Sequence, residues 1–147
     1  MNKYMKKAIN EAIKGVNQNH GGPFGAVIVK NGEIVSTAHN QVLKSNDPTS
    51  HAEINAIKKA SKKLQTFDLS GCDIYTTCMP CPMCMGAIRW ANISNIYYGA
   101  TSEDAQSLGF RDKLFYDEEH QNIRSIDRAS CLSVFRLWSE KPNKTIY

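Results

Sequence analysis

The chain has 147 residues, of which 41% are hydrophobic and 22% are charged, as expected for one globular domain with its own core. No apolar run approaches the roughly 20 residues that cross a bilayer, and the N-terminus lacks the apolar segment of a secretory signal. The net charge of +4 is mild and no block of five like charges occurs, so charge gives little indication of nucleic-acid binding. The five cysteines are an odd number, and three fall close together, which favours a reducing cytoplasm and metal binding over a disulfide framework.

The N-terminal part of the chain predicts a helix followed by a β-hairpin. Residues 2–17 carry apolar side chains at three- and four-residue spacing, which predicts a helix with one apolar face. The Gly-Gly-Pro sequence at 21–23 ends this helix. Residues 24–30 form an apolar, β-branched run typical of a buried strand. An Asn-Gly turn signal follows, so residues 33–39 are predicted to be the antiparallel partner strand.

The rest of the chain alternates helices and strands. Residues 40–50 are predicted to be a polar loop, and residues 101–122 are polar and irregular, with short helical turns at most. The other predicted elements are a helix over 51–64, a strand over 74–77, a helix from 82 to 90, a strand over 95–99, a strand over 123–129 and a last helix through 131–138. This order indicates an α/β fold with three α/β/α layers around one mixed sheet of about five strands, forming a single domain over 1–147.

Two short motifs carry candidate chemistry: His-Ala-Glu at 51–53 and Pro-Cys-Pro-Met-Cys at 80–84. One imidazole from His51 and two thiolates, from Cys81 and Cys84, make a ligand set that favours zinc. Three protein ligands leave a fourth tetrahedral position open for water, which is typical of catalytic zinc and not of structural zinc. Glu53 can lie near that position and carry protons from an activated water. Both motifs fall at predicted helix starts, whose positive dipole ends favour thiolates.

Other interpretations of these motifs exist. Ser50-x-x-Glu53 matches a helix capping box, in which Glu53 only bonds the backbone. The Cys78-x-x-Cys81-x-x-Cys84 spacing resembles the start of an iron–sulfur run, but the fourth cysteine of such a run does not follow. Cys78 and Cys81 also have the spacing of a redox pair. The joint occurrence of both motifs favours a zinc enzyme, with Cys78 as a strand-end residue and not a ligand.

At these motifs the sequence resembles the cytidine deaminase-like superfamily, and within it the bacterial guanine deaminases, over nearly the whole chain. The segments that carry the superfamily resemblance are 21–29 (GGPFGAVIV), Asn40, 46–53 (NDPTSHAE) and 80–88 (PCPMCMGAI). Much of this is shared with tRNA adenosine deaminases, so these segments indicate the superfamily and the reaction type. The features that resemble the guanine branch more narrowly are 109–112 (GFRD), Phe115-Tyr116 and the terminal Tyr147.

The resemblance implies the α/β/α fold, one Zn²⁺ per chain and the hydrolytic loss of ammonia from a purine base, guanine for the named branch. It also implies a homodimer that exchanges C-terminal segments. The implied site residues are the zinc ligands His51, Cys81 and Cys84, the proton carrier Glu53, a second acid at Asp112, purine contacts from Asn40 and the backbone of Ala52, pocket residues Phe24, Trp90 and Phe110, and a pocket-closing Tyr147.

Two departures from the family pattern bear on the substrate. Met79 stands where relatives usually carry glutamate, and Arg111 stands where an acid is common. Other deaminase substrates therefore stay open: tRNA adenosine, a guanosine-type nucleoside, cytosine or an aminotriazine. From a different class, the same fold could serve as a non-catalytic zinc or RNA-binding module. The intact Glu53 and the open ligand position argue against such a module.

Overall fold

The computed structural model describes residues 1–118 and 123–147. The chain divides into two compact units, Met1–Asp117 and Glu118–Tyr147, and each is described by itself. The first unit carries the sheet and both metal-ligand motifs. Part of the segment predicted to be irregular, 119–122, lies outside the described residues.

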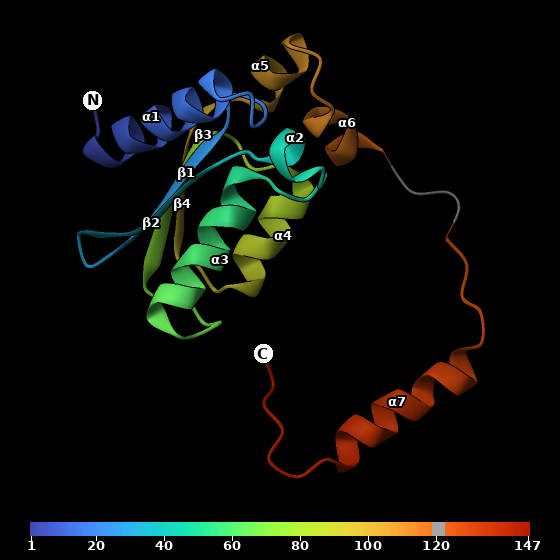
Figure 1. Cartoon of the computed structure of the whole chain (residues 1–147). Helices are drawn as coiled ribbons and strands as arrows, with labels where there is room; N and C mark the ends of the chain where they lie inside the picture. Colours follow the sequence, from blue (N-terminus) through green and yellow to red (C-terminus); the bar gives the residue numbers. More distant parts are fainter. Residues whose placement is uncertain (119–122) are drawn as a thin grey trace. The chain divides into compact units, whose positions relative to one another are not determined.

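A mixed four-stranded sheet with the order β2-β1-β3-β4 forms the centre of the first unit (Figure 1). Its strands are β1 (Gly25–Lys30), β2 (Glu33–His39), β3 (Cys72–Cys78) and β4 (Asn95–Ala100). β1 pairs antiparallel with both β2 and β3, and β3 pairs parallel with β4. The prediction of a mixed sheet is confirmed, with four strands in the described residues where about five were expected.

The predicted strand over 123–129 is wrong. Residues 123–127 are not in a strand, and Arg128 and Ala129 already belong to α7 (Arg128–Glu140). The helix that was predicted through 131–138 begins earlier, at Arg128, and Asp127 occupies the N-cap position. A strand also needs a neighbouring strand edge to pair with, which no sequence pattern in this stretch specifies.

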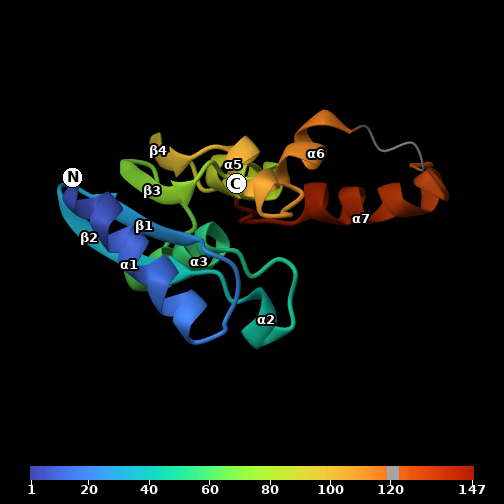
Figure 2. The same cartoon turned by 90° about the horizontal axis from the view of Figure 1, so that it is seen from above.

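Helices cover both faces of the sheet, so the three-layer prediction is confirmed. Helix α1 (Lys3–Asn17) covers one face, and helices α3 (Ala52–Leu64) and α4 (Pro82–Trp90) cover the other (Figures 1 and 2). The alternation of side chains along β1 divides its apolar run between the layers. Val27 and Val29 pack with Ala8 of α1, whereas Ala26 and Ile28 pack in the larger core that includes α3 and α4.

The contact between α1 and β1 is unusually close. A Cβ atom on Gly25 would lie 2.0 Å from the carbonyl oxygen of Ala8, so only glycine lets the helix backbone approach the strand this far. Ala8 is fully buried in this contact. Small residues at both positions therefore set the distance between the first layer and the sheet.

Three short helices lie outside the longer predicted elements, one in the predicted loop over 40–50 and two within 101–122, where short helical turns were predicted. They are α2 (Val42–Ser45), α5 (Ser102–Ser107) and α6 (Asp112–Asp117). α5 starts with a capping box between Thr101 and Asp104, and α6 packs beside α5. These helices matter because α2 and the start of α6 line the site described below.

The second unit contains α7 alone among the described elements. A last helix over 131–138 was predicted, and α7 spans it. None of its residues is buried within the chain, and Phe135 and Leu137 are each about 70% exposed. In the described part of the chain, no helix combines the length and hydropathy that a bilayer crossing requires.

Candidate active site

The three predicted metal ligands meet at the starts of two helices. His51 is the N-cap residue of α3, and Cys81 is the N-cap residue of α4, with Cys84 one turn further along. The Nδ1 atom of His51 lies 3.6 Å from Sγ of Cys81 and 3.5 Å from Sγ of Cys84. Such separations match the edges of a tetrahedron around an ion with bonds of about 2.0–2.3 Å. Within residues 1–118 and 123–147, this trio is the only group of three or more side chains with metal-ligand spacing.

The electrostatics of the trio favour a divalent cation. A hydrogen bond from Cys84 and another from His51 lower the pKa of the Cys81 thiol to about 4, despite burial. The hydrogen bond with Cys81 raises the pKa of the Cys84 thiol, and burial beside Glu53 raises it further. Metal binding requires both sulfurs as thiolates. Cys81 is thus already ionised at neutral pH, and Cys84 gives up its proton when the ion binds.

Glu53 lies directly beside the trio. Its Oε2 atom accepts a hydrogen bond from the Cys84 thiol at 3.3 Å, and the side chain is buried. Burial is the main cause that raises the pKa of Glu53. The predicted alternative of a Ser50 cap is not formed, because the N-cap residue of α3 is His51 and Ser50 bonds Asn55 instead. A buried carboxyl group with a raised pKa next to a metal site is suited to accept and release a proton.

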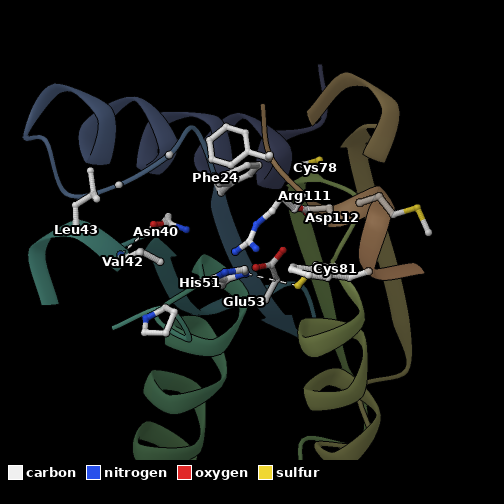
Figure 3. Close-up of a pocket in the computed structure, with 16 residues that line it drawn as sticks. Phe24, Asn40, Val42, Leu43, His51, Glu53, Cys78, Cys81, Arg111 and Asp112 are labelled. Atoms are coloured by element: carbon white, nitrogen blue, oxygen red, sulfur yellow. Dashed lines mark hydrogen bonds between the residues drawn. The ribbon is translucent and has the colours of Figure 1, made fainter. Parts of the chain in front are cut away.

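A cavity of about 420 Å³ opens above His51, Glu53 and Cys81 (Figure 3). The lining residues predicted from the sequence are Phe24, Asn40, His51, Glu53, Cys81, Phe110 and Asp112. The Phe24 and Phe110 rings meet edge to face with centroids 4.9 Å apart and form an aromatic wall. Apolar walls with a few polar groups are typical of a small-molecule site.

Asn40 is held in one orientation. Its Oδ1 atom accepts a hydrogen bond from the backbone N–H of Val42 at 3.0 Å. The backbone N–H of Asn40 donates to the carbonyl of Phe24. A Cβ atom on Gly21 would lie 2.0 Å from Oδ1 of Asn40, so glycine is required beside it. Because the amide oxygen is engaged by the backbone, the NH₂ group is the part that lies on the cavity side (Figure 3). Asn40 therefore presents a donor to a ligand.

The start of α6 supplies the far wall. Asp112 lines the cavity, and burial, followed by the negative charge of Cys81, raises the pKa of its carboxyl group. Arg111 stacks on the Phe115 ring, with its guanidinium carbon 5.1 Å from the ring centroid, and extends into the cavity (Figure 3). In the described parts of the chain, Arg111 makes no ion pair within 4 Å.

Residues 1–100 match the family model of the cytidine and deoxycytidylate deaminase zinc-binding region. The chain belongs to this deaminase family. The metal trio described above is the zinc site of a deaminase, and its donor set and geometry fit that ion.

Individual relatives extend the similarity beyond the family region. The guanine deaminase of Bacillus subtilis (strain 168) is 44% identical over 151 residues, covering 98% of this chain and 97% of that protein. The solved structure of that protein matches with a TM-score of 0.92 at 43% identity, covering 100% of this chain and 99% of the other. The tRNA-specific adenosine deaminase of Aquifex aeolicus is 43% identical over 97 residues, covering 66% of this chain and 64% of the relative. The structure of guanine deaminase from Nitrosomonas europaea matches with a TM-score of 0.69 at 26% identity, covering 89% and 70%.

Some predicted residues of the deaminase lie elsewhere. Trp90 is the last residue of α4 and does not line the cavity. Tyr147 belongs to the second unit, which is described by itself. Their roles stay predictions. Cys78 lies outside the metal trio: its thiol donates to the carbonyl of Thr101, and burial raises its pKa to about 11.

Sequence reasoning missed part of the cavity wall. Val42 and Leu43 reach it from α2, Pro48 from the following loop and Phe115 from α6. Met79, noted as a departure from the family, also lines the cavity. The available sequence signal for a ligand-facing surface was the pair of apolar residues Val42 and Leu43 within a polar segment.

Proposed function

We propose that the protein is a guanine deaminase, which converts guanine and water to xanthine and ammonia. The observation that carries the proposal is the segment 110–115, which lines the cavity but lies beyond the family region at 1–100. The similarity to the Bacillus subtilis guanine deaminase continues through this segment, since it covers 98% of the chain. The cavity volume is near the lower end of the usual range for small-molecule sites, which suits a free base.

The reaction joins the oxygen of water to C2 of the purine and breaks the bond from C2 to the exocyclic nitrogen. When bound to His51, Cys81 and Cys84, zinc acts as a Lewis acid that makes water in the cavity more acidic. Glu53 accepts the proton that this water loses and passes it to the ring nitrogen beside C2. Its raised pKa favours the protonated form that must exist between these two transfers.

The new hydroxyl group on C2 loses its proton as the carbonyl of xanthine forms, and the exocyclic nitrogen must gain a proton before it leaves as ammonia. Asp112 lines the same cavity as His51 and Cys81, and its raised pKa suits a donor of this proton, which the proton from the C2 hydroxyl then replaces. Asn40 orients the ring by donating from its NH₂ group to a ring acceptor. The backbone N–H of Ala52, at the first turn of α3, is a second donor at the helix start. Phe24 and Phe110 exclude water from the faces of the base.

The enzyme acts as a homodimer that exchanges C-terminal segments, and Tyr147 closes the pocket of the partner. Exposed apolar side chains on α7 support this assembly, because an isolated helix of this kind gains most from a packing partner. Asp112 lines the cavity of its own chain, which supports an exchange limited to residues beyond 117.

Exchange has a direct test by complementation. A chain that carries Glu53→Gln is refolded with a chain that lacks Tyr147, and the mixed dimers are identified by mass. If Tyr147 acts in the partner's site, mixed dimers contain one complete site and regain activity above either parent. If it acts within its own chain, mixed dimers gain nothing.

The five free cysteines of the chain are consistent with a reducing cytoplasm as the place of action. The function itself is tested by ammonia release from guanine, guanosine, cytosine, ammeline and a tRNA anticodon stem-loop with zinc-loaded protein. We expect turnover with guanine and little with the others. Preferred turnover of the stem-loop, with strong salt dependence, would instead identify a tRNA adenosine deaminase. Zinc binding without ammonia release from any of them would identify a non-catalytic module.

A further inference from the structure

Three titratable side chains form a hydrogen-bonded series outside the metal site, and no step above uses them. Glu11 lies on α1, His39 ends β2, and His20 lies in the loop after α1. The Nδ1 atom of His39 lies 3.0 Å from Oε2 of Glu11, and its Nε2 atom lies 2.8 Å from Nδ1 of His20. The two imidazole rings stack with centroids 5.1 Å apart. His39 is buried at the centre of this series, the Glu11–His39–His20 relay, whereas Glu11 and His20 are partly exposed.

The protonation of the relay follows from its geometry. A carboxylate only accepts, so Nδ1 of His39 carries the proton that it shares with Glu11. Nε2 of His39 then accepts from the Nδ1–H of His20. One added proton is tolerated, because a doubly protonated His39 donates to both neighbours. With a second added proton, Nε2 of His39 and Nδ1 of His20, 2.8 Å apart, would both carry hydrogens. The hydrogen bond between the two rings would then be lost.

The relay is connected to the segment that holds Asn40. The carbonyl of His20 accepts hydrogen bonds from the backbone N–H groups of Leu43 and Lys44, each at 3.0 Å. These groups belong to α2, which follows Asn40 and includes the Val42 N–H that fixes its amide. His39 directly precedes Asn40. The imidazole of His20 thus ties the loop beside Gly21 and α2 to the end of β2, on both sides of Asn40.

We propose that the Glu11–His39–His20 relay is a positioning device that keeps the NH₂ group of Asn40 directed at the substrate. The role assigned to Asn40 rests on the proposed function, whereas the effect of the relay on the 40–45 segment does not. His20 and His39 are positioning residues, because neither lines the cavity or belongs to the metal trio, and they act through the lining residues beside them.

The relay gives substrate binding a pH dependence. The charged groups around it are Lys14 on α1, Lys44 on α2 and Lys59 on α3, in addition to Glu11 itself. Burial lowers the pKa of His20 below its ordinary value of 6.5, and Lys44 and His39 lower it further. Protonation of His20 therefore needs a lower pH than that of an ordinary imidazole, and the relay breaks where it occurs. The KM for guanine should rise in this range as the pH falls.

His20→Phe tests the proposal, since it keeps the ring stacking and removes the hydrogen bond. We expect KM for guanine to rise about fivefold, as for the loss of one hydrogen bond, with kcat and zinc content unchanged. Backbone amides of the 40–45 segment should exchange with solvent about tenfold faster. The rise of KM at low pH should disappear, because His39 then has no second imidazole whose protonation could oppose it. Glu11→Ala should raise KM and amide exchange in the same way. Glu11→Gln, whose side chain still accepts a hydrogen bond from His39, should stay close to the wild type in both.

Thr37→Val is the matched control. Thr37 donates to the other oxygen of Glu11 at 3.4 Å and takes no part in the relay, so this variant should keep the wild-type KM, pH profile and amide exchange. An unchanged KM and unchanged exchange of residues 40–45 in His20→Phe would overturn the proposal. If wild-type protein does not deaminate guanine, the proposed function fails. The amide exchange measurement then still supports or overturns the relay by itself.

Discussion

The hydroxyl of Tyr116 donates a hydrogen bond to the carbonyl oxygen of Pro80 at 2.5 Å. This contact joins α6, which carries Asp112, to the turn that carries the zinc ligand Cys81. Pro80 is fully buried, so its carbonyl has no access to solvent. The Tyr116 phenol is therefore one of the contacts that set the distance between Asp112 and the metal site.

Tyr116→Phe should leave the fold and zinc content intact while it loosens the start of α6. The unpaired carbonyl of Pro80 should cost about 1–3 kcal/mol of the free energy of unfolding. Misplacement of Asp112 should lower kcat by about tenfold. Calorimetry and steady-state kinetics measure the two effects, with Tyr98→Phe, an exposed position on β4, as the control. A normal kcat in Tyr116→Phe would show that α6 is positioned by other contacts.

Glu53→Gln should separate proton transfer from folding. The amide keeps the size of the side chain but cannot carry a proton between water and the ring nitrogen. We expect folding and zinc content to persist while kcat falls by at least about 100-fold. Single-turnover ammonia release is the measurement. Turnover close to that of the wild type would end the role proposed for Glu53.

Removal of individual thiols should identify the zinc ligands. Purified protein should hold about one zinc per chain. Cys81→Ala and Cys84→Ala should lose the metal, as measured by elemental analysis, and the activity, as measured by ammonia release. Cys78→Ala should keep both, because this thiol bonds the carbonyl of Thr101 and lies outside the trio. Full zinc retention in Cys81→Ala would refute the ligand set.

Arg111 should contribute to the choice of base. Its guanidinium extends into the cavity, and two of its N–H groups match the O6 and N7 acceptors of guanine, a pairing worth about 1–3 kcal/mol of discrimination. We expect Arg111→Leu to raise KM for guanine about tenfold or more. Deamination of 2,6-diaminopurine, which carries an amino group at C6, should change little. An equal loss for both bases would assign Arg111 to general electrostatics and not to recognition of O6.

Asp112→Asn should raise the stability of the metal-free protein and lower the activity of the zinc-loaded enzyme. The pKa of Asp112 is raised above its ordinary value of 3.8, mainly by burial. The folded chain therefore binds this proton more tightly than the unfolded chain, and the resulting stability is present below pH 3.8 and lost as the pH rises through the folded-state pKa. Metal-free Asp112→Asn should be more stable than metal-free wild type at neutral pH, and the difference should shrink toward about pH 4. Urea unfolding with a chelator measures this difference. A gap independent of pH would contradict the burial of the charge.

With zinc bound, the same variant should lose most guanine turnover, because the leaving amino group lacks its proton donor. Full activity of Asp112→Asn would remove this residue from the mechanism.

Local patterns predicted the zinc site well. His51 and Glu53 are two residues apart, and Cys81 and Cys84 are three apart, so each motif is fixed by one turn of helix or less. The helix starts that carry them were equally visible, since Pro82 is favoured in a first turn. The alternating pattern of strands and helices was sufficient for the three layers.

The features that were missed depend on contacts between distant segments. The predicted strand over 123–129 had the residue types of a strand but no partner edge. Leu43 and Phe115 line one cavity from two short helices, and neither segment alone indicates a ligand. Glu11, His20 and His39 come from three different elements, and only the packing of α1 against the hairpin brings them into one series.

The close approach of Gly25 to Ala8 has a consequence for the order of folding. The helix, the turn and the hairpin that this contact unites are consecutive in the chain, so they close only short loops and can form early. The zinc ligands, by contrast, are 30 and 33 residues apart and join two helices that flank β3. We expect the N-terminal helix and hairpin to act as the nucleus, with metal capture as a late maturation step. A cell short of zinc would then accumulate a compact apoprotein that is ready for activation, instead of unfolded chains exposed to proteolysis.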